Sequence, residues 1–148
     1  MAVTTGSGSI FALNKNNGKI IWSNKITAPI RAAPIISGNF FLILAKDNRL
    51  YAYNLTNGEL EWTHERLEET STFMGSSSPV VSKGIVVVTY SSGEIYAINL
   101  SNGMVIWNDN LSTLVQKKSL ENISDIIGNA VIQNDTVYVI SHNGKMVS

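Results

Sequence analysis

Short runs of apolar residues alternate with polar turns along this chain. Residues 10–13 and 19–22 form two such runs, and Asn17-Gly18 lies between them. Because an Asn-Gly pair readily adopts the positive φ that a tight turn needs, the pattern predicts a hairpin of two antiparallel strands. No segment with helical periodicity interrupts the runs, so the chain is predicted to be all-β.

This hairpin occurs three times, in segments 8–22, 48–62 and 93–107. The spacing between successive copies, measured from tryptophan to tryptophan, is 40 and then 45 residues. A period of that length, with several short strands in each unit, is typical of a β-propeller blade. Three residue types recur at fixed positions of the copies: Ala12, Ala52 and Ala97; Gly18, Gly58 and Gly103; and Trp22, Trp62 and Trp107.

A further pair of apolar runs precedes each of the two later hairpins. Pro34 and Pro79 each lie 28 residues before the tryptophan of their repeat and open this pair. One period therefore holds four strands, which is the number in a propeller blade. We expect the repeated alanines to lie where a larger side chain would push neighbouring blades apart. The repeated tryptophans should bury a large apolar area between blades.

The chain begins and ends within a repeat, so it holds about three and a half blades. The approximate repeats are 1–27, 28–67, 73–112 and 124–148 of one partial propeller domain. Since propellers close with roughly four to eight blades, we expect a part of a longer ring, or a chain that completes its ring with other copies. The end blades of an open arc would leave association surfaces, which predicts self-association.

Two linkers, residues 63–75 and 108–128, are longer than the minimal repeat requires. Loops that lengthen on one side of a repeat array commonly form its binding face. The alternative is that both are plain solvated connectors. Glu65, Glu68 and Glu69 in the first linker are interpreted as such a solvated acidic segment.

Composition excludes several classes of function. The 148 residues carry 11 basic and 11 acidic side chains with no run of either sign, which argues against nucleic acid as a partner. The absence of cysteine excludes disulfides, thiolate metal sites and cysteine nucleophiles. No apolar run approaches the roughly 20 residues of a spanning helix. Residues 1–6 lack the basic and apolar segments of a signal peptide.

Candidate catalytic residues are few. His64 and His142 are the only histidines and lie in different repeats near turns, whereas a zinc site needs three or four ligands. Serines 76–78 could be imagined as nucleophiles, but no strand-turn-helix elbow surrounds them. We therefore expect no catalytic residue and no metal site.

The repeat Ala-(Ile/Leu/Tyr)-Asn-x-x-Asn-Gly-x-x-x-Trp resembles that of the quinoprotein-type propellers. Within that superfamily, segments 73–81, 91–94, 124–128 and 141–147 resemble the BamB-like family of outer-membrane assembly factors. The resemblance covers essentially the whole chain and implies the interior of an eight-bladed ring. It also implies a non-enzymatic periplasmic lipoprotein, associated with the outer membrane, that belongs to the β-barrel assembly (BAM) machinery. Its implied partners are the periplasmic domains of the barrel insertase and unfolded outer-membrane proteins.

The resemblance also implies which residues bind the partner. The family has a Leu-x-Leu-Arg-Gly loop and a neighbouring Ser-Asp-x-Asp loop, which correspond here to residues 71–75 and 124–127. The Arg and the second Asp are replaced here, so the usual charge pair cannot form, and an apolar patch takes its place. The partner-binding residues implied in this way are Phe73, Met74, Gly75, Asp125 and Ile127.

Two other functions stay open from the sequence. Quinoprotein dehydrogenases share this repeat, but they bind pyrroloquinoline quinone with calcium, a stacking tryptophan and usually a disulfide of adjacent cysteines. This chain has no cysteine, and its tryptophans occupy the repeated structural position. We therefore expect no cofactor, with a dehydrogenase fragment as the alternative. The other alternative is a propeller sensor domain.

Overall fold

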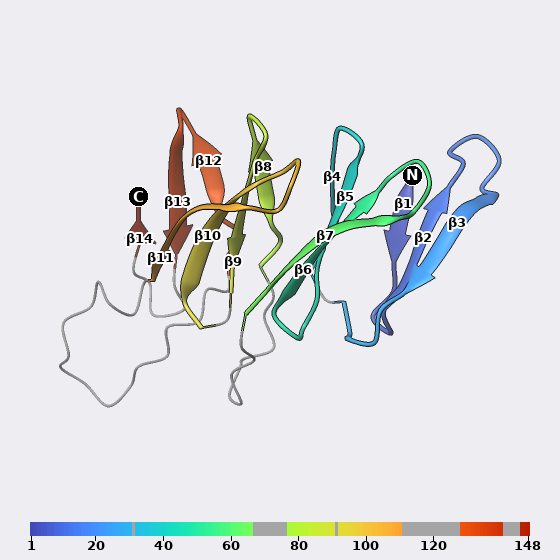
Figure 1. The fold of residues 1–148 in the computed structure, drawn as a ribbon, viewed down its shortest axis with the longest axis horizontal. Coiled ribbons are helices and arrows are strands. Elements are labelled where there is room, and N and C mark those ends of the chain that lie inside the picture. Colours follow the sequence, from blue (N-terminus) through green and yellow to red (C-terminus); the bar gives the residue numbers. More distant parts are fainter. Residues whose placement is uncertain (31, 67–76, 91, 111–127, 141–145) are drawn as a thin grey trace. The chain divides into compact units, whose positions relative to one another are not determined.

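The computed structural model describes residues 1–30, 32–66, 77–90, 92–110, 128–140 and 146–148. These residues form antiparallel strands and no helix (Figure 1). A membrane-crossing helix is thus not found in the described part of the chain. The chain divides into two compact units, Met1–Arg66 and Leu67–Ser148, which are described separately below.

Each unit contains two antiparallel sheets, and the strands of each sheet follow one another in the sequence. The first unit holds β1 (Ala2–Thr4), β2 (Ser9–Leu13) and β3 (Ile20–Lys25), then β4 (Ile35–Ser37), β5 (Phe40–Leu44), β6 (Arg49–Asn54) and β7 (Leu60–Glu65). The second unit holds β8 (Val80–Ser82), β9 (Ile85–Thr89), β10 (Glu94–Asn99) and β11 (Val105–Asn110), then β12 (Val131–Gln133), β13 (Thr136–Ile140) and β14 (Met146–Val147).

The sheets β4–β7 and β8–β11 have the four meandering strands that the repeat predicts, and the all-β propeller fold is confirmed. The assignment of all 148 residues to one partial propeller with the stated repeat boundaries stays a prediction. The two predicted linkers, 63–75 and 108–128, begin too early in the chain, because β7 continues to Glu65 and β11 to Asn110. His64 accordingly lies within a strand and not at a turn.

The repeated hairpin turn is built by its first asparagine and its glycine. In the first copy, the N–H of Asn16 donates to Oδ1 of Asn14 at 2.9 Å, and the N–H of Gly18 donates to the Asn14 carbonyl at 2.8 Å. Gly18 has a φ of +69°, which a glycine adopts without a Cβ penalty. The same two bonds recur in the turns headed by Asn54 and Asn99.

A β-bulge in each hairpin sets the repeated alanine opposite the repeated tryptophan. Ala12 pairs with Trp22, whereas Leu13 pairs with Ile20, so the outer strand carries one extra residue. The same register shift follows the pairs Ala52–Trp62 and Ala97–Trp107. All three alanines are buried. An alanine therefore leaves room for the indole beside it.

Face-to-face packing of successive sheets forms the core of the first unit. Here we call forward face the side of a sheet that packs on the following sheet, and back face the opposite side. The forward face of β1–β3 and the segment after β3 pack on the back face of β4–β7. The side chains buried in this contact include Ile10, Ile26, Ala28, Ile30, Phe41, Ile43, Tyr51 and Tyr53.

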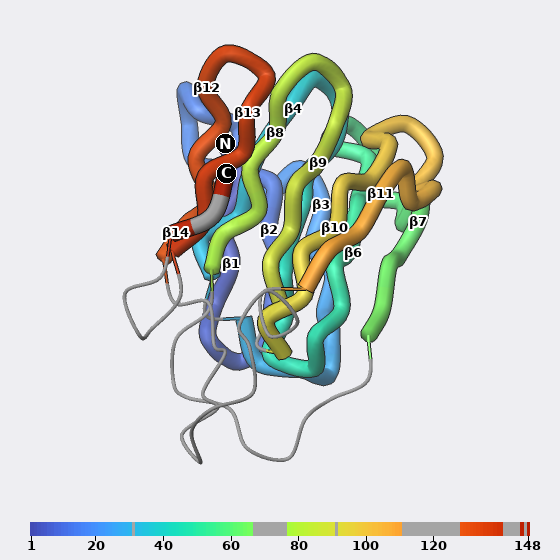
Figure 2. Tube along the Cα trace, turned by 90° about the vertical axis from the view of Figure 1, so that its left-hand side faces the viewer, coloured from blue at the N-terminus to red at the C-terminus, as the bar shows by residue number. Residues whose placement is uncertain are grey.

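The second unit repeats this arrangement. The forward face of β8–β11 contributes Val87, Ile95 and Ala97, and the sheet β12–β14 contributes Val139 from its back face. Figure 2 shows the hairpins β8–β9 and β12–β13 side by side, consistent with the proximity of β8 and β12. Burial of this apolar area is the main favourable term that holds the two sheets together.

Trp22 fixes the first contact between sheets. Its indole N–H donates to the Leu55 carbonyl at 2.9 Å, and its ring lies 6.3 Å from that of Phe41. A Cβ added to Gly58 would lie 2.6 Å from the indole, so the ring rests directly on that glycine. Asn24 donates to the Gly58 carbonyl at 2.6 Å beside it. Gly58 thus forms its own turn and also provides the surface on which Trp22 of the preceding hairpin packs.

Gly58→Ala should destabilise the chain more than Gly18→Ala. Both glycines have positive φ, +78° and +69°, so both variants carry the strain of an L residue there. Only Gly58 meets the indole, whereas nothing lies within 4 Å of a Cβ at Gly18. We expect Gly58→Ala to lose about 1–3 kcal/mol more free energy of unfolding, measured in urea. Equal losses of free energy of unfolding in the two variants would contradict the packing of Trp22 on Gly58.

Candidate partner-binding surface

The segments that join successive sheets differ in length. Nine residues separate β3 from β4, fourteen separate β7 from β8, and twenty separate β11 from β12. The short connector packs closely, because Ile26, Ala28 and Ile30 are buried and the Pro29 carbonyl accepts the N–H of Lys46 at 2.9 Å. The other two connectors therefore contain residues beyond those needed to join neighbouring sheets.

The predicted partner-binding residues belong to these two longer connectors. Phe73, Met74 and Gly75 in the first, and Asp125 and Ile127 in the second, all lie outside the described residues. The described residues at the ends of the connectors nevertheless show where both segments leave and rejoin the sheets.

A hydrogen bond joins the ends of the two long connectors. The backbone N–H of Ser78 donates to Oδ1 of Asn129 at 2.8 Å, across 51 residues of sequence. Ser78 precedes β8, and Asn129 precedes β12. The two connectors therefore rejoin their sheets at adjacent points. Buried Ser77 and Ala130 lie next to these residues in the chain and hold this junction against the protein interior.

A cluster of polar side chains lies where the first long connector leaves β7. Arg49 forms an ion pair with Glu65 across the β6–β7 pair, and its guanidinium lies 5.9 Å from the Tyr51 ring centroid. The Tyr51 hydroxyl donates to Oδ2 of Asp47 at 3.3 Å. Glu65 therefore belongs to a strand-end ion pair and not to a linker, while its side chain is solvent-exposed as the sequence predicts.

Burial and the neighbouring charges of this cluster shift the pKa of Tyr51. Burial of the ring raises the pKa of Tyr51, the Asp47 carboxylate raises it further, and Arg49 lowers it. The phenol is thus neutral at physiological pH and remains a hydrogen-bond donor. The cluster presents a phenol donor, a cation and two carboxylates at the end of the sheet where the connector begins.

The next sheet carries a related cluster in which a carboxylate replaces the guanidinium. Glu94 occupies the repeat position of Arg49, and it accepts hydrogen bonds from Ser92 at 3.0 Å and from the Tyr96 hydroxyl at 3.4 Å. The Tyr96 ring packs edge-on against Tyr90 with centroids 5.7 Å apart. The sequence signal for both groups is a tyrosine two residues after a charged strand start, and the repeat comparison alone did not single it out.

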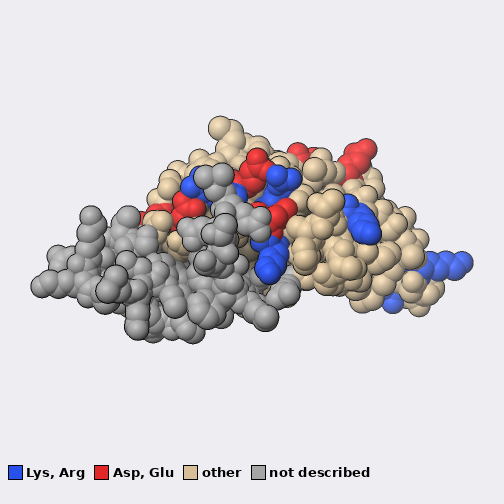
Figure 3. Space-filling model, turned by 90° about the horizontal axis from the view of Figure 1, so that it is seen from below, with Lys and Arg blue, Asp and Glu red and all other residues tan. Residues whose placement is uncertain are grey.

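Charges of both signs are interspersed over the described surface in the view of Figure 3, which agrees with the zero net charge. Among the described residues, no cluster of three or more metal-ligating side chains occurs. Of the remaining candidates, Ser77 is buried, whereas Ser76, Glu68, Glu69 and His142 lie outside the described residues. The described surface thus carries hydrogen-bonded polar side chains and paired charges.

The repeated tryptophans are not equally covered. Trp22 and Trp62 are partly buried, whereas 41% of Trp107 is exposed. Trp107 lines a groove of about 310 Å³ with Ile85, Val87, Ile132 and Val137. Lys83 and Asp135, which form an ion pair at 2.7 Å, also line this groove.

Antiparallel sheets that follow one another along the chain and pack face to face define a β-propeller. The crystal structure of BamB from Moraxella catarrhalis has the same fold, with a TM-score of 0.85 and 20% identity over 98% of this chain and 44% of that chain. A quinohemoprotein alcohol dehydrogenase from Pseudomonas putida is also similar, with a TM-score of 0.74, 15% identity and coverage of 98% and 27%.

The family model of the outer membrane protein assembly factor BamB matches residues 1–148, and the chain belongs to this family. The factor from Yersinia pestis is 24% identical over 94% of this chain, and the one from Bordetella pertussis is 26% identical over 99%. The chain spans 35% and 38% of the length of these relatives. The family resemblance, which rests on the loop segments within the repeats, is thereby confirmed.

Asn129→Ala should expose the backbone N–H of Ser78. A hydrogen bond of this kind contributes about 1 kcal/mol, so exchange of the Ser78 amide should accelerate about fivefold, measured by hydrogen exchange and NMR. Asn129→Asp is the matched control, because its carboxylate keeps an oxygen acceptor at the same place. Faster exchange in both variants would contradict the role of this oxygen.

Asp47→Asn should lower the pKa of Tyr51, because it removes a carboxylate that disfavours the phenolate. NMR titration of the tyrosine Cζ carbons measures this pKa. Glu61→Gln is the control, since Glu61 bonds Asn54 at the other end of the sheet. A raised phenol pKa contributes stability that is lost as the pH rises above about 10, so the variant should lose less stability there. An unchanged pKa of Tyr51 in Asp47→Asn would contradict the interaction between Asp47 and the Tyr51 hydroxyl.

Proposed function

We propose that this chain is a binding module of the outer-membrane β-barrel assembly machinery and not an enzyme. Its membership of the assembly-factor family supports the proposed role in outer-membrane protein assembly. The chemistry of the described surface supports binding, because it offers paired charges and hydrogen-bond donors. The proposal includes a periplasmic location at the outer membrane, as the family resemblance implies.

The observation that carries the proposal is the hydrogen bond between Ser78 and Asn129. Recognition of one partner by two loops requires that both loops belong to one surface. The sequence separates the predicted loops by some fifty residues, yet their downstream ends meet within hydrogen-bond distance. Phe73, Met74, Gly75, Asp125 and Ile127 are thus proposed to act together.

The proposed partner is a folded periplasmic domain of the barrel insertase. Phe73, Met74 and Ile127 would supply apolar contacts, and the polar cluster around Glu94 would lie near the rim. An apolar centre with a polar rim is the usual composition of a protein interface. The chain's zero net charge favours such a partner over a strongly charged one.

An unfolded outer-membrane protein is the second proposed ligand. The strand β11 is an edge strand of its sheet in the described part of the chain, and Val105, Ile106 and Trp107 on it are exposed. An extended segment can add to such an edge through main-chain hydrogen bonds. The bulge before Trp107 interrupts regular pairing, so addition is expected along residues 107–109.

A fragment of a quinone-dependent dehydrogenase is the alternative, and the fold shared with a quinohemoprotein alcohol dehydrogenase is the observation in its favour. A fold does not fix a function, so the two proposals need a direct comparison. Titration of the chain with pyrroloquinoline quinone and calcium should give no saturable binding. Saturable binding would favour the dehydrogenase. A propeller sensor domain would bind neither the quinone nor the insertase.

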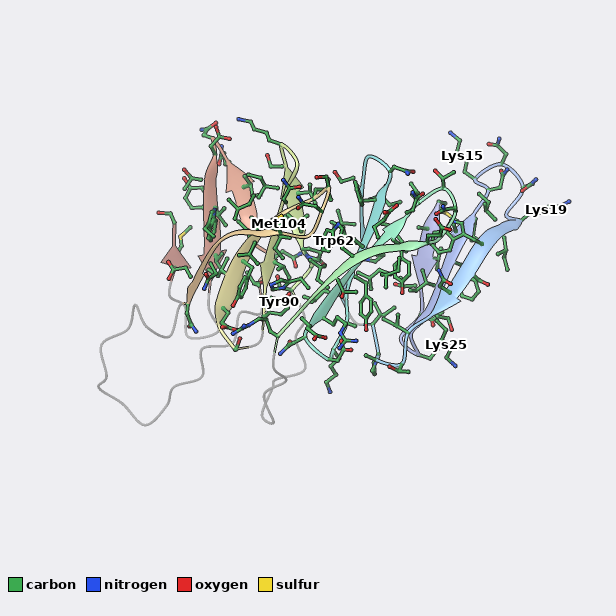
Figure 4. The ribbon with its side chains drawn as sticks, in the orientation of Figure 1. Lys15, Lys19, Lys25, Trp62, Tyr90 and Met104 are labelled. Carbon is green, nitrogen blue, oxygen red and sulfur yellow. The ribbon has the colours of Figure 1, made fainter. Side chains whose placement is uncertain are left out.

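The chain should bind the periplasmic domains of the barrel insertase, measured by isothermal titration calorimetry. Phe73→Ala and Asp125→Ala should each weaken the affinity about tenfold, because both residues are proposed to lie at the contact. Met104→Ala is the matched control, since Met104 is exposed on the β10–β11 turn at the opposite end of its sheet (Figure 4).

The folded state of each variant is checked by circular dichroism. Absence of binding by the folded wild-type chain would overturn the proposed partner. Equal affinity of wild type, Phe73→Ala and Asp125→Ala would keep the partner but overturn the proposed loops. Weaker binding by Met104→Ala would place the contact at the other end of the sheet.

A further inference from the structure

The Asn-Gly pair of each hairpin turn holds its asparagine side chain in the same way. In each turn, Oδ1 of this asparagine accepts the backbone N–H of the residue that follows the glycine. All three asparagines are exposed. The donor and acceptor residues are Lys19 and Asn17 at 3.1 Å, Glu59 and Asn57 at 3.0 Å, and Met104 and Asn102 at 3.0 Å.

An asparagine in this position can react with the glycine that follows it. The glycine backbone nitrogen gives its proton to a base in solvent and attacks Cγ of the asparagine. A cyclic imide forms and ammonia leaves, taking its additional proton from solvent. Water then opens the imide and leaves either aspartate or isoaspartate. Glycine has no side chain to obstruct the attack, and the N–H that binds Oδ1 stabilises the oxyanion that develops there.

One of the three turns differs in what binds the nitrogen of the side-chain amide. Nδ2 of Asn57 donates to Oε2 of Glu59 at 2.7 Å. The position of Glu59 is occupied by Lys19 in the first repeat and by Met104 in the third. In the described part of the chain, no carboxylate binds Nδ2 in those two repeats. The second turn alone thus holds its side-chain amide at both ends.

This additional bond protects Asn57. A hydrogen bond to a carboxylate is about twice as strong as one between neutral groups. The two bonds to Glu59 fix the plane of the Asn57 amide, whereas the attacking nitrogen must approach Cγ from outside that plane. The carboxylate also draws the amide hydrogen toward itself, which strengthens electron donation from Nδ2 into the carbonyl. Cγ therefore becomes less electrophilic.

The protected turn is the one on which Trp22 packs. Isoaspartate adds a methylene group to the main chain, and a longer main chain at residues 57–58 would displace the glycine beneath the indole. A second carboxylate braces the same turn, because Nδ2 of Asn54 donates to Oε1 of Glu61 at 2.8 Å. Carboxylates thus bind both asparagines that build this turn.

We infer that Asn17 and Asn102 are sites of spontaneous deamidation and that Glu59 protects Asn57 from the same reaction. In all three turns the glycine N–H donates to the carbonyl of the first asparagine, so that bond does not distinguish the turns. The bond between Nδ2 and the carboxylate does distinguish them. Because it must break before Cγ is attacked, the reaction at Asn57 is slower by a factor of at least about ten.

Two exchanges between the second and third repeats test the inference. Glu59→Met gives the second turn the residue of the third, so Asn57 should deamidate at least about tenfold faster than in the wild type. Met104→Glu gives the third turn the carboxylate, so deamidation of Asn102 should slow by a similar factor. Met104 is 66% exposed, so its replacement leaves the core of the sheet intact.

Mass spectrometry of peptides measures the rate at each asparagine. The chains are incubated in mildly alkaline buffer prepared with heavy-oxygen water, so that each new carboxylate carries a labelled oxygen. Circular dichroism verifies that each variant stays folded during the incubation. In the wild-type chain, Asn17 and Asn102 should each react at least about tenfold faster than Asn57.

Glu61→Met is the matched control, because it removes a carboxylate of the same turn that binds Asn54 and should leave the rate at Asn57 unchanged. Equal rates at the three asparagines of the wild type would overturn the inference, and so would the absence of reaction at all three. An unchanged rate at Asn57 in Glu59→Met, or at Asn102 in Met104→Glu, would do the same. Equal acceleration by Glu61→Met would overturn the role of the bond to Glu59.

Discussion

The packing of one sheet's forward face on the next sheet's back face is the interaction on which each unit depends. A single antiparallel sheet of three or four short strands buries little apolar area by itself. In the first unit, Ile10 and Phe41 come from opposite sheets and are completely buried in one cluster. Trp22 adds a directional element, since its indole N–H binds a carbonyl of the following sheet.

This packing also explains the spacing of the repeated residues. The glycine must form a turn at positive φ and must also leave space for an indole, and Gly58 meets both requirements at once. The alanine must fit beneath the tryptophan of its own hairpin, as Ala12 does opposite Trp22. Because the sheets carry these constraints, the connectors between them are free to lengthen. Function in this family member is accordingly proposed for the connectors.

The proposed binding surface and the packing between sheets use different parts of the repeat. The two long connectors leave the ends of the strands, whereas the forward and back faces lie on the flat sides of the sheets. A partner bound at the connectors would therefore leave the contacts between sheets in place. Trp107 lies in the groove beside the second contact, and its partial exposure leaves it accessible there.

The sequence by itself determined the hairpins and the repeat, because Asn-Gly turns and apolar runs are local and recur three times. The loop segments 73–81 and 124–128 then pointed to the assembly-factor family. It placed Ala12, Gly58 and Trp22 correctly within their turns and strands. Only the tertiary structure decided that Trp22 rests on Gly58 of the following sheet and that Ser78 meets Asn129. Such contacts join residues far apart in sequence, and no local pattern encodes which distant residue will be the partner. The ends of β7 and β11 were likewise decided by cross-strand partners such as Arg49 and Glu65.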